Sequence, residues 1–192
     1  MNVYQTILKR RSIRRFKQTA ISLRILKKMV NSARLAPSSA NRQPCEYIIV
    51  NDQSLLDSVF ATLRWAGYIA PAGDPPEGQR PVAYLVTLVN TRIRKYNYQW
   101  DVGASMENMI LTALEEKIGS CWIGSINRKR LRKILGVPTY LTIDSVLALG
   151  YPNEKPVLEK MKDSIRYWKD RKGRLHVPKR KLSQILHYNK YN

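Results

Sequence analysis

Three guanidinium groups and one hydroxyl lie within five residues near the start of the chain, in the segment Arg10-Arg11-Ser12-Ile13-Arg14. Arginine forms paired hydrogen bonds with phosphate oxygens, and a serine hydroxyl can donate one more. The apolar residues Tyr4, Ile7 and Leu8 predict a short helix just before the cluster, which therefore falls where a helix ends and the chain turns. The segment is a candidate phosphate-binding site. A basic run of this kind is also typical of a solvated helix end, and both interpretations stay open.

A second candidate is the segment Pro37-Ser38-Ser39-Ala40-Asn41-Arg42-Gln43-Pro44. Its small side chains would let a ligand approach the backbone closely, and the amide of Asn41 offers both a donor and an acceptor to a heteroaromatic edge. The same residue types are typical of an ordinary turn.

A third candidate is Gly119-Ser120-Cys121-Trp122-Ile123-Gly124-Ser125, where a predicted strand ends in a glycine. Without a Cβ, Gly124 would allow a flat ligand to pack directly against the backbone. The alternative is a routine connection between a strand and a helix.

The usual catalytic constellations are missing from the sequence. It contains two histidines, His176 and His187, and no GxSxG, Walker A, HExxH or strand-linked GxGxxG pattern. The two cysteines, Cys45 and Cys121, cannot form a disulfide framework or a structural zinc site. We therefore expect no catalytic side chain and no metal ligand. A cofactor that performs the chemistry while the protein holds it fits this pattern better.

The net charge of +20 is concentrated in particular segments of the chain. Residues 1–45 carry eleven basic and no acidic side chains, residues 128–133 carry five basic ones, and residues 155–192 carry twelve basic against three acidic. The two ends could converge on one compact anionic ligand, or the charge could serve a nucleic acid. Composition alone does not decide between them.

Length and hydrophobicity exclude several classes of protein. The 192 residues fit one domain spanning 1–192, and 44% hydrophobic residues are too many for a disordered basic tail. No run of about 18 apolar residues predicts a membrane span, and the N-terminus lacks the pattern of a secretory signal. We expect a cytoplasmic protein.

Hydrophobic periodicity predicts mixed helices and strands without strict alternation, and therefore an α+β fold. The predicted strands are Tyr47–Val50, Val82–Val89, Cys121–Ile123, Ile143–Leu149 and Ser164–Trp168. Beyond the first short helix, the predicted helices begin after Ser22, surround Leu55, Val59 and Leu63, span 99–117, run from Asn127 to Leu135, and close the chain at Lys181–His187. Between them, Gly67–Pro81 is predicted to be a loop long enough to be functional.

In this order, the candidate segments resemble the FMN-dependent nitroreductase family over nearly the whole chain. No single motif is strong, but five occur in the family's order. The resemblance is carried by Arg10–Phe16, Ala36–Pro44, the long helix leading into Gly119–Gly124, Leu149–Pro152 and His176–Arg180.

The resemblance implies a homodimer with an α+β sandwich: a central, mostly antiparallel sheet flanked by helices, and a C-terminal strand exchanged between subunits. It also implies two FMN molecules at the dimer interface. By analogy, Arg10, Arg11, Ser12 and Arg14 hold the phosphate and ribityl chain, and Lys179 and Arg180 complete the phosphate site. Pro37, Ser38, Ser39 and Asn41 contact the same FMN, some of them from the partner chain, while Ile123 and Gly124 lie beside the isoalloxazine.

The implied activity is hydride transfer from NADH or NADPH through FMN to a small electrophilic acceptor, such as a nitroaromatic or a quinone. No membrane or nucleic-acid partner is expected. The alternative is a basic nucleic-acid-binding protein that reuses the fold without redox activity. It would draw on Arg128–Lys133 and on aromatic residues that interleave with the basic C-terminal segment, namely Tyr167, Trp168, Tyr188 and Tyr191.

Overall fold

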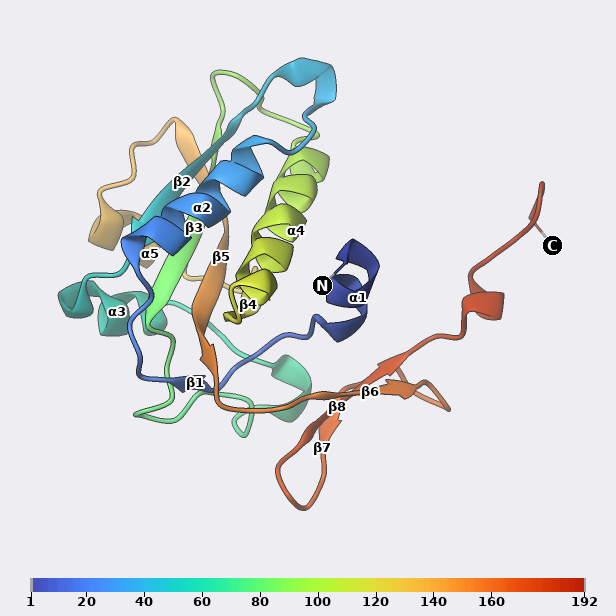
Figure 1. The fold of residues 1–192 in the computed structure, drawn as a ribbon. Helices are drawn as coiled ribbons and strands as arrows, with labels where there is room; N and C mark the ends of the chain where they lie inside the picture. Colours follow the sequence, from blue (N-terminus) through green and yellow to red (C-terminus); the bar gives the residue numbers. More distant parts are fainter. Residues whose placement is uncertain (1, 192) are drawn as a thin grey trace.

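The computed structural model describes residues 2–191, and a five-stranded antiparallel sheet forms its centre (Figure 1). The long strand β5 (Leu141–Pro152) pairs with β3 (Ala83–Asn90) along one edge and with β4 (Gly119–Ile123) along the other. Strand β2 (Cys45–Val50) extends the sheet beyond β3, and β1 (Phe16–Lys17) pairs with the end of β5.

Helices cover both faces of this sheet. Helices α2 (Leu23–Arg34) and α4 (Gln99–Glu115) pack on one face, whereas α3 (Gln53–Phe60) and α5 (Arg128–Leu135) pack on the other. Helix α1 (Val3–Lys9) contacts α4. No helix within residues 2–191 is long and apolar enough to cross a membrane.

The apolar sequence of β3 explains the three layers. Alternate residues of a strand point to opposite faces of the sheet. Tyr84, Val86 and Leu88 accordingly belong to the core shared with α3 and α5, whereas Ala83 and Leu85 belong to the core shared with α2 and α4. A continuous apolar run is therefore needed in this strand, because both of its faces are buried. The predicted sandwich is confirmed.

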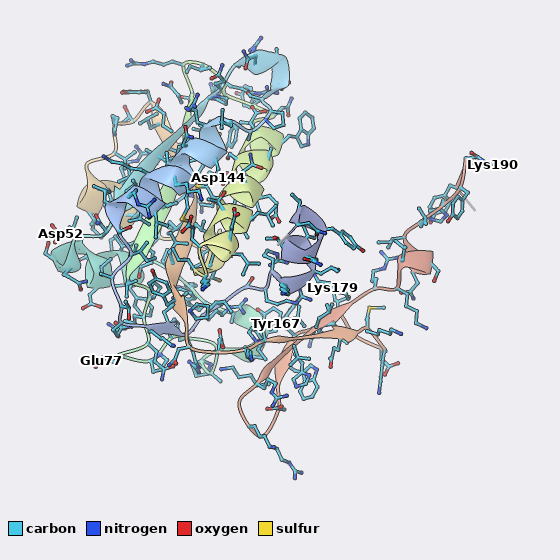
Figure 2. The ribbon with its side chains drawn as sticks, in the orientation of Figure 1. Asp52, Glu77, Asp144, Tyr167, Lys179 and Lys190 are labelled. Atoms are coloured by element: carbon cyan, nitrogen blue, oxygen red, sulfur yellow. The ribbon has the colours of Figure 1, made fainter. Side chains whose placement is uncertain are left out.

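A C-terminal arm, residues 153–191, leaves this body after β5 and extends away from it (Figure 1). It contains a second small sheet in which β8 (Leu175–Lys179) pairs in parallel with β6 (Val157–Lys160) and antiparallel with β7 (Trp168–Lys169). Figure 2 shows Lys179 on this arm and Lys190 near its far end.

The structure differs from three of the predicted elements. A strand and a helix predicted in the arm are wrong, and one helix of the body ends earlier than predicted. Of the strand predicted at Ser164–Trp168, only Trp168 belongs to a strand, because β8 offers β7 just two paired positions before the chain turns. The helix predicted at Lys181–His187 is a single 3-10 turn, Leu182–Gln184. Its side chains are exposed, and a helix this short is unstable without packing. The helix predicted around Leu55, Val59 and Leu63 ends at Phe60, and Leu63 pairs with Ile126 instead.

Part of the positive charge on α5 has a structural use. The Arg128 guanidinium donates to three backbone carbonyls, those of Gly124, Ile143 and Asp144. The Arg132 guanidinium donates to the carbonyls of Val137, Pro138 and Leu141. Charged donors of this kind satisfy carbonyls directly after β4, after α5 and at the start of β5. These two arginines are therefore less available to a nucleic acid than the sequence implied.

Gly150 marks a close approach between β5 and β1. A Cβ built on Gly150 would lie 2.7 Å from Phe16, which is fully buried. We expect Gly150→Ala to lower the free energy of unfolding by about 1–3 kcal/mol, because overpacking forces strain into a dense core. Gly67→Ala is the control, since nothing lies within 4 Å of its Cβ position. Equal free energies of unfolding for both variants, measured by urea denaturation, would contradict this packing argument.

Candidate functional site

The first and third sequence candidates lie side by side. Ser12 pairs with Ser120 of β4 in an isolated parallel bridge, and the Ile13 N–H donates to the Ser120 carbonyl at 2.9 Å. Gly119 permits this contact, because a Cβ there would lie 2.8 Å from Ile13. Helix α1 ends just before the motif, where the Arg10 N–H donates to the Thr6 carbonyl. The segment from Arg10 to Arg14 therefore runs along the edge of β4.

Two cavities flank this part of β4. The first, of about 300 Å³, is lined by Arg10, Ser12, Glu107, Ile110, Ser120 and Trp122. The second, of about 230 Å³, contains Arg14, Ile123 and Gly124 in its lining and also includes Trp122. Five of the predicted site residues thus lie on β4 or directly beside it: Arg10, Ser12, Arg14, Ile123 and Gly124.

The arginines of this segment carry positive charge without a carboxylate partner. Among residues 2–191, no carboxylate oxygen lies within 4.0 Å of a guanidinium nitrogen of Arg10, Arg11 or Arg14. The Glu154 carboxylate accepts the Arg14 backbone N–H instead. The Nε atoms of Arg11 and Arg14 are buried and have no acceptor in the described chain. Burial, and then the neighbouring Arg10 charge, lower the pKa of Arg11. An anion placed here would relieve this repulsion.

The second candidate segment adopts a fixed but strained shape. Ala40, Asn41 and Gln43 have φ angles of 53°, 52° and 50°, a region that residues other than glycine rarely occupy. The Ser38 hydroxyl accepts the Gln43 N–H at 2.9 Å, and the Asn41 amide oxygen accepts from the Gln43 side chain at 3.0 Å. Such strain persists where surrounding contacts hold it, often at ligand sites.

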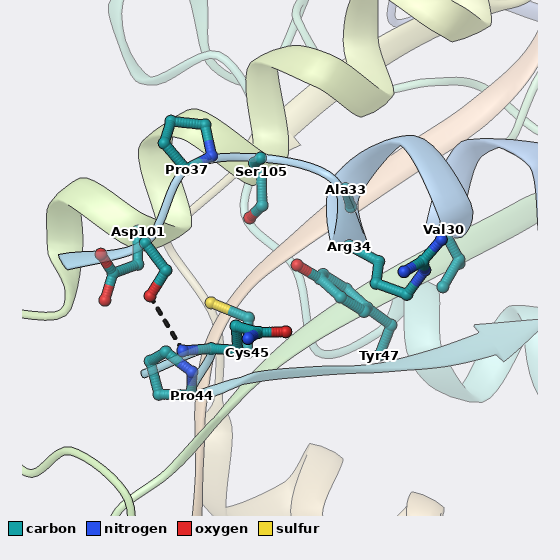
Figure 3. A pocket seen from close by; sticks show the side chains of 12 residues that line it. Val30, Ala33, Arg34, Pro37, Pro44, Cys45, Tyr47, Asp101 and Ser105 are labelled. Carbon is teal, nitrogen blue, oxygen red and sulfur yellow. Dashed lines mark hydrogen bonds between the residues drawn. The ribbon is translucent and has the colours of Figure 1, made fainter. Parts of the chain in front are cut away.

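Asp101, at the start of α4, anchors this segment to the body. Its carboxylate accepts the Ser39 N–H at 2.9 Å and lies 3.5 Å from the Arg94 guanidinium, with 4% of its side chain exposed. Pro37 and Ser38 line a cavity of about 270 Å³ in which Asp101, Cys45 and Tyr47 also take part (Figure 3). This cavity shares no lining residue with the two beside β4.

Cys45 and Tyr47 are neutral at pH 7. Burial raises the pKa of the Cys45 thiol to about 11 and also raises the pKa of the Tyr47 hydroxyl. The thiolate is the reactive form of cysteine, so Cys45 is not set up as a nucleophile. Figure 3 shows both side chains in the cavity below Pro37.

The remaining predicted residues, Lys179 and Arg180, lie on the C-terminal arm. Together with Leu158 and Leu182 they line an open groove of about 660 Å³, which shares no residue with the cavities beside β4. Within one chain, the predicted site residues therefore fall into three separate groups.

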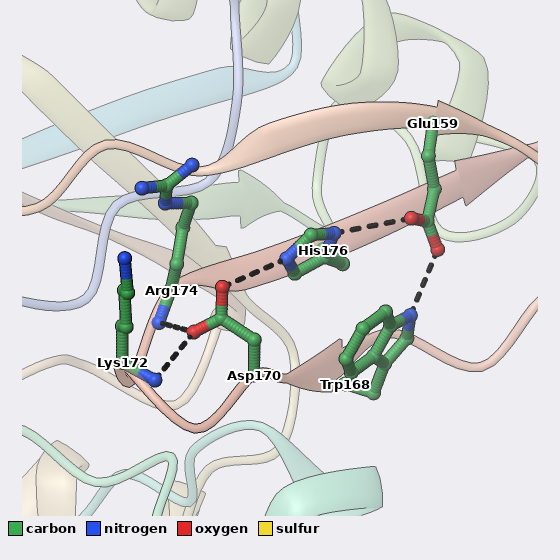
Figure 4. Close-up of polar contacts among 6 residues, drawn as sticks. All are labelled: Glu159, Trp168, Asp170, Lys172, Arg174 and His176. Carbon is green, nitrogen blue, oxygen red and sulfur yellow. Dashed lines mark hydrogen bonds and ion pairs between the residues drawn. The ribbon is translucent and has the colours of Figure 1, made fainter.

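Sequence reasoning missed a polar cluster that holds the arm together. His176 lies between two carboxylates, 3.1 Å from Glu159 and 3.3 Å from Asp170 (Figure 4). The Trp168 ring stacks on it with centroids 4.2 Å apart, and its indole N–H donates to Glu159 at 2.8 Å. Glu159, Trp168 and His176 come from the three strands of the small sheet and Asp170 directly follows β7, so no local spacing in the sequence reveals the cluster.

We expect the small sheet of the arm to loosen in acid. The indole N–H of Trp168, followed by His176, lowers the pKa of Glu159, and the backbone N–H of Arg174, with His176, lowers that of Asp170. A carboxyl whose pKa is lowered by folding stabilises the fold above its unfolded pKa, near 4, and loses that effect as pH falls through the lower folded value. Hydrogen exchange should show less protection of β6 to β8 at pH 3 than at pH 5.

Trp168→Phe is the matched variant for this test, because it keeps an aromatic ring on His176 and removes the indole donor. At pH 5 the strands β6 to β8 of this variant should already be less protected from hydrogen exchange than those of the parent chain. Their protection should also depend less on pH. Unchanged protection of the arm from pH 5 to pH 3 in the parent chain would refute the role of the two carboxylates.

Sequence reasoning also missed Arg64, Trp65 and Tyr167 as lining residues of the cavity that contains Arg14. Arg64 reaches it because its N–H donates to the Ser125 carbonyl at 3.0 Å, which fixes the chain beside the end of β4. A contact between segments so distant in the sequence leaves no local signal.

Known proteins resemble this chain in sequence and in fold. The model of the nitroreductase family matches residues 7–151. A protein of Archaeoglobus fulgidus, named for NADH dehydrogenase and NAD(P)H nitroreductase activity, is 33% identical over 156 residues, which are 78% of this chain and 84% of that protein.

Solved structures agree with this match. A nitroreductase family protein of Clostridium novyi superposes with a TM-score of 0.68 at 28% identity, covering 82% of this chain and 90% of that one. A protein of Desulfovibrio desulfuricans, named as a nitroreductase and solved in complex with FMN, superposes with a TM-score of 0.70 at 24% identity. That pair covers 100% of this chain and 99% of the other, and shows the fold alone.

Proposed function

Because the chain belongs to the nitroreductase family, we propose that it is an FMN-dependent oxidoreductase, which takes a hydride from NADH or NADPH and reduces a small electrophilic acceptor. The acceptor is a nitroaromatic, a quinone or a similar small molecule. The name of the Archaeoglobus relative supports the nicotinamide reductant, and the Desulfovibrio structure supports FMN as the cofactor.

The observation that carries the proposal is the unpaired arginine segment beside the end of β4. Arg10, Arg11 and Arg14 have no carboxylate partner in the described chain, and two of them hold buried donors without acceptors. A phosphate supplies the missing charge and acceptors. Ser12 lines one cavity together with Arg10, and its hydroxyl can donate to a phosphate there, whereas Arg14 lines the second cavity. These groups fit the phosphate end of FMN.

The backbone at the end of β4 fits the flat part of the cofactor. A Cβ built on Gly124 meets no atom within 4 Å, so this glycine faces open space in its cavity. Ile123, the residue before it, is buried in the core shared with α3 and α5. Bound FMN would supply hydride acceptance and donation. The chain's own residues hold it, orient it and exclude water, which requires no nucleophilic side chain.

We further propose that the site is completed by a second copy of the chain. Pro37, Ser38, Ser39 and Asn41 lie in a different part of the molecule from Arg10 to Arg14, so a partner chain would bring the two groups onto one FMN. Large apolar side chains are exposed on α1 and the arm, and a dimer would bury them. They are Val3, Tyr4, Ile7, Leu8, Leu182, Ile185, Leu186, Tyr188 and Tyr191. Lys179 and Arg180 would reach the phosphate through exchange of the arm.

Purification of the chain tests this proposal directly. The preparation should be yellow, should release FMN when denatured, and should oxidise NADH or NADPH when a nitroaromatic or quinone is added. A colourless protein that does not bind added FMN, yet binds oligonucleotides with a steep dependence on salt, would overturn the proposal in favour of the nucleic-acid alternative.

A further inference from the structure

The cavity at the end of β4 has features that cofactor binding alone does not use. Its volume is about 230 Å³, and aromatic and cationic side chains dominate its wall. The side chains that matter here are Arg14, Arg64, Trp65, Trp122 and Tyr167.

Two arginines and no acidic side chain line this cavity, although the Glu154 carboxylate accepts the backbone N–H of Arg14. Arg64 is exposed, and no carboxylate oxygen of the described residues lies within 4.0 Å of its guanidinium. Two of the lining residues also hold buried donors that lack acceptors in the described chain. Trp65 is 5% exposed and its indole N–H has no partner among residues 2–191, as is true of Arg14 Nε. The residues that line the cavity therefore bring positive charge to it and no carboxylate.

The aromatic part of the wall is held by the C-terminal arm. The Tyr167 ring lies 5.2 Å from the Arg14 guanidinium and 5.0 Å from the ring of Tyr68, which precedes the turn at Pro71. The Tyr68 N–H donates to the Tyr167 hydroxyl at 3.4 Å, which uses an acceptor that the cavity would otherwise offer. Trp122 is 45% exposed and presents a further flat surface. Flat rings of this kind favour a planar ligand.

We propose that the acceptor reduced at this site is a planar aromatic anion, in which an aryl carboxylate carries the reducible group and Arg64 binds the carboxylate. This inference rests on the proposed function, because it takes FMN to lie beside Ile123 and Gly124. Arg14 is assigned to the cofactor, which leaves Arg64 as the cation available to a second molecule. A guanidinium binds a carboxylate through two parallel hydrogen bonds, and this geometry would also orient the aromatic ring.

The first test measures binding without turnover. Benzoate and benzamide have the same shape and differ in charge, and calorimetry on the purified protein gives both dissociation constants. Benzoate should bind more tightly than benzamide. Arg64→Gln should weaken benzoate binding about tenfold or more, the effect expected for one charge-assisted contact, and should leave benzamide unchanged. Equal benzoate affinity in the parent chain and in Arg64→Gln would overturn the inference.

The second test measures reduction of 4-nitrobenzoate and 4-nitrobenzamide with NADH in excess. Each nitro group reduced to nitroso takes two electrons from one NADH, consumes one further proton and releases one water. In Arg64→Gln, kcat/KM for 4-nitrobenzoate should fall about tenfold or more, whereas kcat/KM for 4-nitrobenzamide should not change. Arg130→Gln is the matched control, because Arg130 is an exposed arginine of α5 outside the cavity. An equal fall of kcat/KM for 4-nitrobenzoate in Arg130→Gln would show that the net charge of the protein attracts the carboxylate, and would overturn the inference.

A third measurement separates the acceptor from the reductant, since NADPH is also an aromatic anion. Reduction of the bound flavin by NADH and by NADPH, followed by stopped flow without acceptor, should be the same in the parent chain and in Arg64→Gln. A slower reaction with NADPH alone would assign Arg64 to the reductant's phosphate and overturn the inference. Failure of both nucleotides to reduce the flavin in the parent chain would refute the proposed function instead, whatever the benzoate affinity.

Discussion

A chain truncated after Glu154 is expected to be a monomer that does not retain FMN. The truncation removes the C-terminal arm beyond Glu154, with Lys179, Arg180 and a group of exposed apolar side chains. In the proposed dimer, the two cations complete the phosphate site of the partner. Losing two charge-assisted contacts should weaken FMN binding at least about 100-fold. The body should still fold, because both cores lie outside the arm. Sedimentation and flavin absorbance after dialysis measure the two effects.

Two smaller changes separate these effects. Lys179→Ala with Arg180→Ala should lose flavin and keep the dimer, since it changes charge without removing apolar surface. Ile185→Ser with Leu186→Ser should weaken the dimer first, because both side chains are exposed and apolar in the single chain. A truncated chain that remained a yellow, active dimer would show that the arm contributes to neither the interface nor the cofactor site.

The main sheet could be predicted from sequence because its central strands are buried on both faces. Such strands read as continuous apolar runs, as in β3 and in most of β5. Helix α5 could also be predicted from the sequence, because the Asn127 side chain caps its start and Gly136, with φ of 62°, ends it. In these elements the local signals and the tertiary packing agree.

The arm could not be predicted in the same way. Its strands are two to five residues long and depend on partners that are not adjacent in the sequence. Trp168, for example, ends the predicted strand but pairs only with His176, and the polar contacts that hold the two together involve Glu159. Short strands in polar surroundings have no apolar pattern to mark them.

The candidate site was predictable residue by residue but not in its arrangement. The arginine segment and the end of β4 are each recognisable, yet their contact through Ser12 and Ser120 joins positions more than a hundred residues apart. The left-handed backbone of Ala40 could not be predicted either, because alanine rarely adopts this conformation. Arg64 reached the site through a backbone bond to Ser125 that no motif contains.

Arg10→Ala and Arg14→Ala are each expected to weaken FMN binding about 10- to 100-fold while leaving the chain folded. Each removes one charge-assisted contact with the cofactor, worth about 1.5–3 kcal/mol. Neither guanidinium has a carboxylate partner within 4.0 Å in the described chain, so its removal leaves no buried acid unpaired. Titration of the apoprotein with FMN, followed by flavin fluorescence, gives the dissociation constants.

Arg24→Ala provides the matched control, because Arg24 is an exposed arginine of α2 outside the cavities beside β4. It lowers the net charge by the same amount, so any effect shared with Arg10→Ala reflects the overall field of the protein. Arg10→Lys should recover part of the affinity, since lysine keeps the charge but loses the paired geometry. Raising the salt concentration should weaken FMN binding by the parent chain more than FMN binding by Arg10→Ala. The variant has one cation fewer, so less of its attraction for FMN can be screened. Parent-like FMN affinity in both alanine variants would place the phosphate elsewhere and leave the unopposed charge of this segment without a ligand.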